Sequence, residues 1–427
     1  MANKIKQFTE RAIEGIHDMC YIWAKEMKAT VQDEGVLIFF ILVPILYPLL
    51  YSWAYNNEVV HDVPVAVVDL SNSQLSREFV RKYDASPDTK VAFRCNSLEE
   101  AKQLVGRQLV RGVVLIPTDF DSNINRMQQS HIALYCDMSF LLAYKAIYMT
   151  AVAVSTNINK NIQIKVSGNS TGREDQITTQ PLAFDEVPIF NPTGGYGSFI
   201  IPGVLILIIQ QTLVLGIGLS AGTARENNRF RDLVPVSRHY NGIFRIVLGK
   251  SMCYFMVYAV IAAYLTLIVP RIFHFTAIPH PGALFGLMLP YVLACIFFGM
   301  FISCMVRYRE NVMLLIVFMS VPLLFLSGVS WPHSAMPGAW RAVATLFPST
   351  FGVRGFVRLS SMGASLEDVS TEYLALWFHA LFYFFLTCIV YSYQLHQART
   401  HAISEVEKMK ERIQKAQQKL HSKGASA

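Results

Sequence analysis

Long apolar runs divide this chain into stretches that can cross a bilayer and stretches that cannot. A transmembrane helix needs roughly 20 predominantly apolar residues. Six runs approach or reach that length, at residues 35–53, 199–219, 252–269, 283–306, 312–326 with its extension, and 375–391. The first carries no charge, and its Pro44 and Pro48 predict local kinks rather than an end. The pattern predicts an α-helical polytopic membrane protein with six transmembrane helices.

Between the first two runs the pattern changes to short alternating segments. Apolar runs at residues 65–68, 91–94, 112–116 and 132–135 are typical of strands. Polar segments at 74–82, 98–104 and 119–127 are typical of helices, and a longer helical segment follows at 140–164. Strands that alternate with helices predict an inserted α/β domain. Cys95 and Cys136 stand at the ends of two predicted strands, where a disulfide and two free thiols are both open.

The first 34 residues are mixed and charged, which is not typical of a cleavable signal. Five residues share one helical face, with Lys25 opposite: Ile16, Met19, Cys20, Trp23 and Met27. This amphipathic pattern predicts a helix that lies in the membrane interface. A helix packed on a soluble domain would show the same pattern.

The stretch 325–358 departs from a simple membrane span. An apolar run is broken at Gly328, Pro332 and Pro337, returns at residues 342–347, and ends at Pro348 before it could cross a bilayer. One interpretation is a surface loop with an amphipathic turn. The other is a pair of re-entrant half-helices near 328–350, because irregular backbone at membrane depth must be covered by protein or line a cavity.

Charge assigns sides to these elements. The chain has 427 residues, 53% hydrophobic and 16% charged, with a formal net charge of +7. This composition indicates a membrane protein with a sizeable aqueous part. Lys and Arg concentrate in the amino-terminal segment, the loop 223–250, the short loop after residue 306 and the tail. By the positive-inside rule both termini are cytoplasmic and the α/β domain lies outside. Because the basic residues sort by membrane side, they do not indicate nucleic-acid binding.

The predicted organisation has five parts. They are a cytoplasmic segment 1–34 with an interfacial helix, transmembrane helix 1 at 35–54, an extracytoplasmic α/β domain at 55–190, transmembrane helices 2–6 within 191–394, and a charged, helical cytoplasmic tail at 395–427. The tail repeats apolar residues at three- and four-residue intervals over two heptads, which is short for a coiled coil. We expect a solvated helix that could dock on a partner.

No enzymatic chemistry is predicted. Gly249, Lys250 and Ser251 resemble the end of a phosphate-binding loop, but the preceding Gly242 is at the wrong distance, so we expect Lys250 to snorkel to the interface. We predict no catalytic, cofactor-binding or metal-ligating residues. The spans contain no Asp or Glu, which disfavours an ion-coupled transporter and indicates that energy comes from another chain.

Two sets of polar residues are candidates for a role in transport. Inside the spans lie Gln210, Gln211, Ser320 and His379, which either hydrogen-bond between helices or contact a substrate. Residues 224–233 can form a short amphipathic helix that works as a lever in a partner's groove, or a solvated loop that only fixes topology. The candidate coupling residues are Glu226, Arg229, Phe230, Arg231, Asp232 and Leu233.

The order of elements and a set of short motifs resemble an ABC-2 type permease with a large extracytoplasmic domain. The motifs are DVPVAVVDL ending at Leu70, IPG at 201–203, VPVSR at 234–238, LGK at 248–250, LSG at 326–328, MPG at 336–338, FPST at 347–350 and GASLEDV at 363–369. In permeases of this family the loop between the second and third spans commonly has the sequence glutamate, x, glycine, threonine, leucine. This chain departs from that pattern after Glu226.

The resemblance implies half of an ATP-driven exporter in a bacterial inner membrane. Two permease chains, alike or different, would pair, and each would engage a separate ABC ATPase that uses ATP and Mg, while this chain binds no cofactor. The substrate would be drug-like, lipid or other cell-envelope material, and membrane lipids and a periplasmic adaptor are further partners. A non-transporting scaffold or signalling protein that binds a partner through the outer domain is the alternative.

The resemblance also favours the half-helix interpretation of the stretch 325–358. It then forms an outer gate, whose residues are Gly328, Trp331, Pro332, Pro337, Trp340, Phe347 and Pro348.

Overall fold

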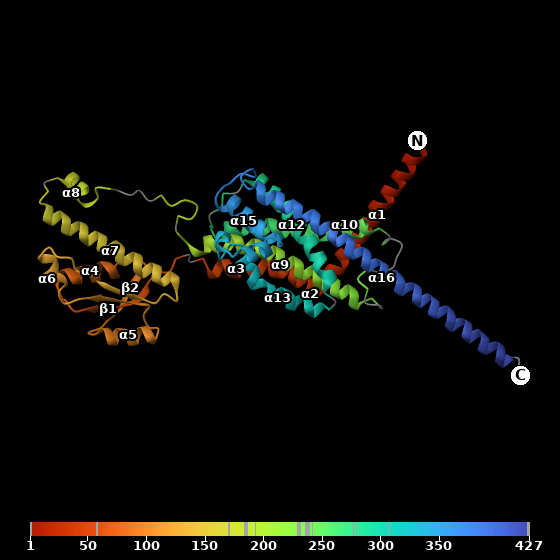
Figure 1. Ribbon diagram of the computed structural model, residues 1–427, viewed down its shortest axis with the longest axis horizontal. Helices are drawn as coiled ribbons and strands as arrows, with labels where there is room; N and C mark the ends of the chain where they lie inside the picture. The colour runs from red at the N-terminus through yellow and green to blue at the C-terminus, as the bar shows by residue number, and fades with distance from the viewer. Residues whose placement is uncertain are drawn as a thin grey trace. The chain divides into compact units, whose positions relative to one another are not determined.

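The computed structural model describes two compact units, Met1–Asn56 with Tyr196–Ala427 and Asn57–Gly195 (Figure 1). We call them the helical unit and the α/β unit. The described residues are 2–56, 59–169, 171–182, 187–192, 194–228, 232–234, 240, 242–275, 277–278, 280–306 and 308–424, without the side chains of 2–12, 412–413 and 415–424.

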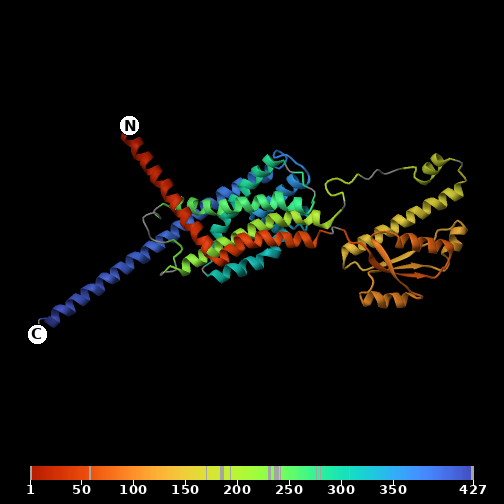
Figure 2. The same ribbon diagram turned by 180° about the vertical axis from the view of Figure 1, so that it is seen from behind.

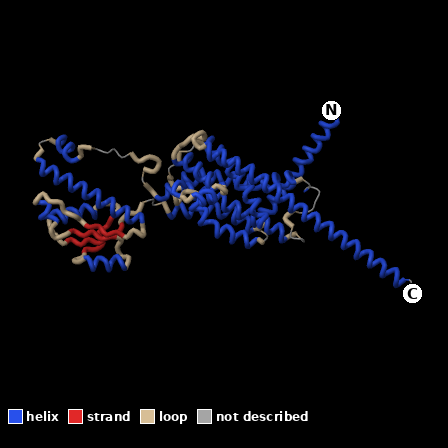
Figure 3. Tube along the Cα trace, in the orientation of Figure 1, coloured by secondary structure: helices blue, strands red, loops and turns tan. Residues whose placement is uncertain are grey.

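The α/β unit is built on a four-stranded sheet in the order β2-β1-β3-β4 (Figure 3). β1 (Val63–Asp69) runs parallel to β2 (Thr89–Arg94) and to β3 (Gly112–Ile116), and β4 (Ala133–Cys136) runs antiparallel to β3. β1 is buried on both faces, as a central parallel strand should be.

Helices cover both faces of this sheet. On one face, α4 (Gln74–Asp84), α6 (Phe120–Asn125) and α7 (Leu141–Ser167) pack against Val65 and Val67 of β1. On the other, α5 (Leu98–Gly106) packs against Ala66 and Val68. α8 (Gly172–Thr179) contacts α7. The period-2 alternation of β1 therefore divides the core into two layers.

The structure excludes a disulfide between Cys95 and Cys136. Both thiols are free, and they pack into the cores on opposite faces of the sheet. Cys95 directly follows the edge strand β2, and Cys136 ends the opposite edge strand β4, so three strand spacings, roughly 14 Å, separate them. A disulfide holds its Cα atoms about 4.4–6.8 Å apart.

In the helical unit the helix α9 (Tyr196–Glu226) is central. It is apolar all round and almost wholly buried, and it contacts most of the other long helices. The helical elements around it are α1 (Ala2–Gln32), α2 (Glu34–Leu37), η1 (Ile38–Leu42), α3 (Val43–Ala54), α10 (Ile243–Ala263), η3 (Tyr264–Ile268), α11 (Val269–Ile272), α12 (Pro281–Met305), α13 (Arg309–Leu326), η4 (His333–Ala335), α14 (Gly338–Ala344), α15 (Pro348–Ser361) and α16 (Ser370–Gly424).

Seven helices in the described part of the chain are long and apolar enough to cross a membrane. Six belong to the helical unit, as expected of a polytopic α-helical membrane protein. The seventh is α7, whose Ala143, Ile147 and Val154 pack on the sheet of the α/β unit. Length and composition alone therefore do not decide the number of spans.

One boundary differs from that expected from the sequence, and another is not a break in the helix. Pro348 does not end a half-helix but begins α15, because the fixed φ of proline suits the first position of a helix. The predicted last span and the predicted helical tail lie in one helix, since α16 runs without interruption from Ser370 to Gly424 (Figure 2).

Candidate functional site

Two polar regions occupy the two ends of the helical unit. We call the end where α9 finishes and α10 begins the loop end. We call the other end the break end. It is formed by residues 327–369, where short elements and irregular backbone interrupt the helical path between α13 and α15.

At the loop end, the packed face of α1 overlaps only in part with the face that the sequence pattern indicated, since Trp23 and Met27 contact the core. Asp18, Ile22, Glu26 and Thr30 follow one another at four-residue spacing, and all four are buried. Ile16, on the expected apolar face, is 61% exposed. The helix contacts α10. Its packed face therefore carries two carboxylates.

Glu26 is the centre of a buried polar cluster. Its carboxylate receives Nζ of Lys250 at 2.9 Å, the hydroxyl of Tyr254 at 2.5 Å and the hydroxyl of Ser220 at 3.2 Å. Burial alone would raise the pKa of this carboxyl, but the Lys250 ammonium and the hydrogen bonds outweigh it and lower the pKa. Lys250 is 4% exposed, so it does not snorkel to the interface as expected; the ion pair with Glu26 holds it inside.

Asp33 forms a second ionic cluster beside the first. It caps α2 by accepting from the backbone N–H groups of Gly35 and Val36. It also accepts from the hydroxyl of Thr223 at 2.5 Å and from the guanidinium of Arg309 at 2.9 Å. Burial opposes ionisation of Asp33, but these donors prevail and lower its pKa.

Further ion pairs and caps connect the helices at this end. Arg225 donates to the backbone oxygen of Cys304 at 3.1 Å and to that of Val306, which satisfies carbonyls at the end of α12. Arg245 pairs with Asp18 at 2.6 Å. Charged side chains thus join α1, α9, α10, α12 and α13.

The predicted lever helix at 224–233 is confirmed only for residues 224–226, which end α9, and is wrong for the other residues of this range that the structure describes. α9 ends at Glu226, which is exposed, and residues 232–234 are not helical. Leu233 is 1% exposed and belongs to the core of the helical unit, and Asp232 pairs with His401 of α16 at 3.1 Å. These contacts hold Asp232 and Leu233 against the helical unit. The three other coupling candidates, Arg229, Phe230 and Arg231, lie outside the described residues.

At the break end, neutral side chains satisfy the interrupted backbone. Gln210 Oε1 accepts from the backbone N–H of Ser349, at the start of α15, at 2.7 Å. His379 Nε2 lies 2.9 Å from the carbonyl oxygen of Thr345, which ends α14. Irregular backbone is thereby paired inside the helical unit, as a membrane environment requires.

Tyr383, which sequence reasoning missed, completes this set. Its hydroxyl donates to the carbonyl oxygen of Leu346 at 2.6 Å. Its place one turn after His379 was the available signal, since side chains four apart share a helix face. The remaining candidate, Gln211, bonds to Ser320 of α13 at 3.4 Å. All four polar residues singled out inside the spans therefore have hydrogen-bond partners within the helical unit.

The predicted gate residues divide into exposed and packed groups. Gly328 adopts a left-handed backbone with φ of 89°, and Pro332 and Pro337 directly precede η4 and α14. Trp331 and Trp340 are 56% and 58% exposed. By contrast, Phe347 packs edge-on against Phe298, and Pro348 is buried.

One buried ion cluster at the break end was also missed. Glu372, in the first turn of α16, is 2% exposed and pairs with Arg354 at 3.4 Å and with Arg358 at 3.3 Å. Its signal in the sequence was a pair of arginines at four-residue spacing in α15. Among the described residues, no group of three or more His, Cys, Asp or Glu side chains is placed to hold a metal ion.

Comparison with protein families gives a match over most of the chain. The family model described as ABC-2 family transporter protein matches residues 35–389. This range includes α9, the break end and the whole α/β unit, whereas Asp18, Glu26 and Asp33 of the loop end precede it. No curated protein matches the chain.

Proposed function

Since the chain belongs to the ABC-2 family of transporter proteins and is thus the membrane permease of an ABC transport system, we propose that it is half of an exporter. A separate ABC ATPase binds the loop end and supplies the energy. The cargo is drug-like, lipid or other cell-envelope material moved outward across the inner membrane. A second permease chain completes the pathway.

The position of the buried charges is the observation that supports this proposal. The ion pairs of Glu26 with Lys250 and of Asp33 with Arg309 lie at the loop end, and those of Glu372 lie at the break end. The described helices that are long and apolar enough to cross a membrane carry no Asp or Glu near their middles, where ion-coupled carriers place them. Energy supplied by a partner at one end fits this distribution.

The loop between α9 and α10 provides a route for that energy. A push on this loop would reach α9 directly, and it would reach α16 through the contact of Asp232 with His401. Because α9 is buried among the other long helices, its displacement would be transmitted to the whole bundle.

The test is co-purification of the tagged full chain with an ABC ATPase, followed by ATP hydrolysis and ATP-dependent uptake in inverted vesicles. We expect hydrolysis to depend on the complex. Glu226→Ala should reduce it, because Glu226 is exposed at the end of α9. Glu310→Ala, at an exposed acid in the first turn of α13 at the same end, is the matched control and should leave hydrolysis unchanged.

Two outcomes would contradict the proposal. If no ATPase co-purifies, the chain is not powered in this way. If both variants behave alike, the loop between α9 and α10 is not the coupling element. Leu233 is a poor probe of coupling, since it is buried and its truncation would disturb the core.

A further inference from the structure

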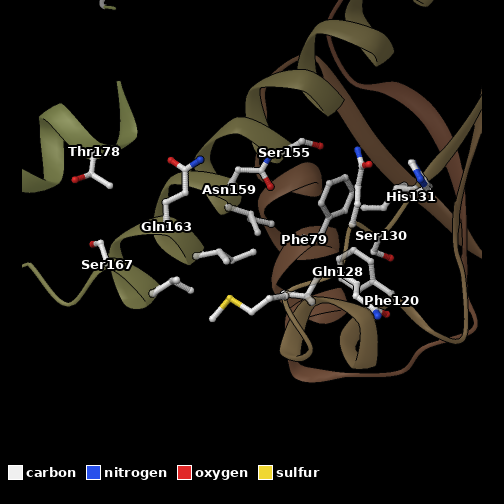
Figure 4. Close-up of a pocket in the computed structure, with 17 residues that line it drawn as sticks. Phe79, Phe120, Gln128, Ser130, His131, Ser155, Asn159, Gln163, Ser167 and Thr178 are labelled. Carbon is white, nitrogen blue, oxygen red and sulfur yellow. The ribbon is translucent and has the colours of Figure 1, made fainter. Parts of the chain in front are cut away.

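The α/β unit holds a cavity of about 690 Å³ beside the second half of α7 (Figure 4). Its size lies within the range of small-molecule sites, roughly 300–1,000 Å³. Phe79 of α4, Phe120 of α6 and Thr178 of α8 also line it, so four helices of this unit contribute to its wall.

The wall that α7 contributes is amphipathic along its length. Its lining residues form two rows at four-residue spacing, a polar row of Ser155, Asn159, Gln163 and Ser167 and an apolar row of Ile158, Ile162 and Val166. Residues four apart lie one above the other on a helix. The polar row extends over roughly 18 Å of helix. The cavity therefore offers an elongated surface with one polar and one apolar edge.

The segment 127–132 lines the cavity across from α7. The Ser130 hydroxyl is buried and has no hydrogen-bond partner among the described residues. A buried polar group without a partner is unfavourable, and a small shift of the segment 127–132 that brought a ligand group to this hydroxyl would remove that penalty. Met127 has a left-handed backbone, with φ of 62°, and its flexible side chain is 72% exposed at the cavity. Such strain in a residue other than glycine is concentrated at functional sites.

The charge of the lining limits the ligand. None of the described residues that line the cavity is Asp, Glu, Lys or Arg, and the only ionisable one is His131. An ion bound there would lose hydration and gain no opposite charge.

We propose that this cavity binds a neutral amphipathic small molecule. The apolar edge of the molecule packs on Ile158, Ile162 and Val166, and its hydroxyl or amide groups bond to Ser130 and to the polar row of α7. This binding is separate from the proposed function, because it holds whether or not the molecule is transported.

The test uses the full chain in nanodiscs and hydrogen–deuterium exchange. The probe is octyl glucoside below its micelle concentration, and octyl phosphate is the control with the same chain and a charged head. We expect octyl glucoside to slow exchange several-fold and saturably in peptides covering residues 120–132 and 155–167, and octyl phosphate not to. Absence of protection, or equal protection by the phosphate, would overturn the proposal.

Three variants locate the site. Gln163→Trp should abolish the protection by filling the cavity, whereas Thr156→Trp, at an exposed position of α7 outside the lining, should retain it. Ser130→Ala should weaken binding several-fold without lowering the unfolding temperature, because it removes an unpartnered polar group. If the hydroxyl had a purely structural role, Ser130→Ala would instead lower the unfolding temperature and leave binding unchanged. Unchanged protection in Gln163→Trp would place the probe elsewhere.

Discussion

The two ends of the helical unit differ in the chemistry that stabilises their buried polar groups. Both bury polar groups where apolar helices meet. The loop end uses full charges, in the pairs of Glu26 with Lys250 and of Asp33 with Arg309. The break end holds its interrupted backbone with the neutral side chains of Gln210, His379 and Tyr383, although the charged Glu372 lies nearby.

The difference shows what each end tolerates. A buried ion pair is strongly destabilised when one partner is lost, because an uncompensated charge is left. The loss of one partner from a neutral hydrogen bond costs less free energy of unfolding. Loss of one partner from an ion pair at the loop end should therefore destabilise the chain more than loss of one neutral hydrogen bond at the break end, in keeping with the proposed force-bearing role. The break end can change its hydrogen bonds at lower cost, as a gate would have to.

The largest effect is expected for Lys250→Met. It leaves the Glu26 carboxylate buried without its cation and should destabilise the chain by about 3–5 kcal/mol. The measurement is the thermal unfolding of the purified full chain. The double variant Glu26→Gln with Lys250→Met removes both charges and should recover much of the loss. If the single and double variants unfold alike, the pair is not coupled.

A smaller loss is expected at the break end for Gln210→Leu. The change keeps the side-chain size but leaves the Ser349 N–H without its acceptor. This should lower the free energy of unfolding by roughly 1–3 kcal/mol. The adjacent Gln211→Leu is the control, because its bonds to Ser320 are long, at 3.4 and 3.5 Å. Equal losses at the two positions would show that burial rather than the cap decides the effect.

A pH-dependent effect is expected for Asp33→Asn. The donors around Asp33 lower its pKa in the folded chain, so its ionic contribution is complete above the pKa of an unfolded aspartate and is lost as the pH falls through the lower folded value. Asparagine can still cap α2. The wild type should therefore be the more stable at neutral pH, and the difference should begin to shrink below about pH 4 and vanish only below the lower pKa of the folded chain. A difference in unfolding temperature that does not change with pH would refute the ionic role.

The smallest effect on stability is expected for Trp331→Ala at the predicted gate. The side chain is 56% exposed, so the free energy of unfolding should change by about 0.5 kcal/mol or less. Transport should nevertheless fall if the residue lines the outer gate. Phe347→Ala is the contrasting variant, because Phe347 packs on Phe298 and its truncation should reduce stability. Unchanged transport in Trp331→Ala would argue against the gate.

Much of the fold could be predicted from local patterns. The run 199–219 lies within the buried α9, and the run 65–68 lies within β1, because hydrophobic periodicity is a property of neighbouring residues. The resemblance to ABC-2 permeases is confirmed by the family match over residues 35–389. The orientation in the membrane and the coupling and gating roles stay predictions.

The candidate sites were less predictable. Gln210 was expected to bond between helices or to a substrate, and only its position opposite Ser349 shows which backbone group it pairs with. Pro348 was interpreted as the end of a half-helix, but it is the first residue of α15. A proline can end one helix or begin another, and the residues around it decide which.

The sequence by itself determined which segments are helices and strands and which of them are apolar enough to be buried. Only the tertiary structure decided which polar residues are buried with them. Glu26 and Lys250 are 224 residues apart, and each alone is a charge that would prefer water. Cys95 and Cys136 share a sheet but face opposite cores. Which distant residues meet, and which do not, depends on how helices and strands far apart in the sequence pack. A local sequence pattern therefore cannot predict it.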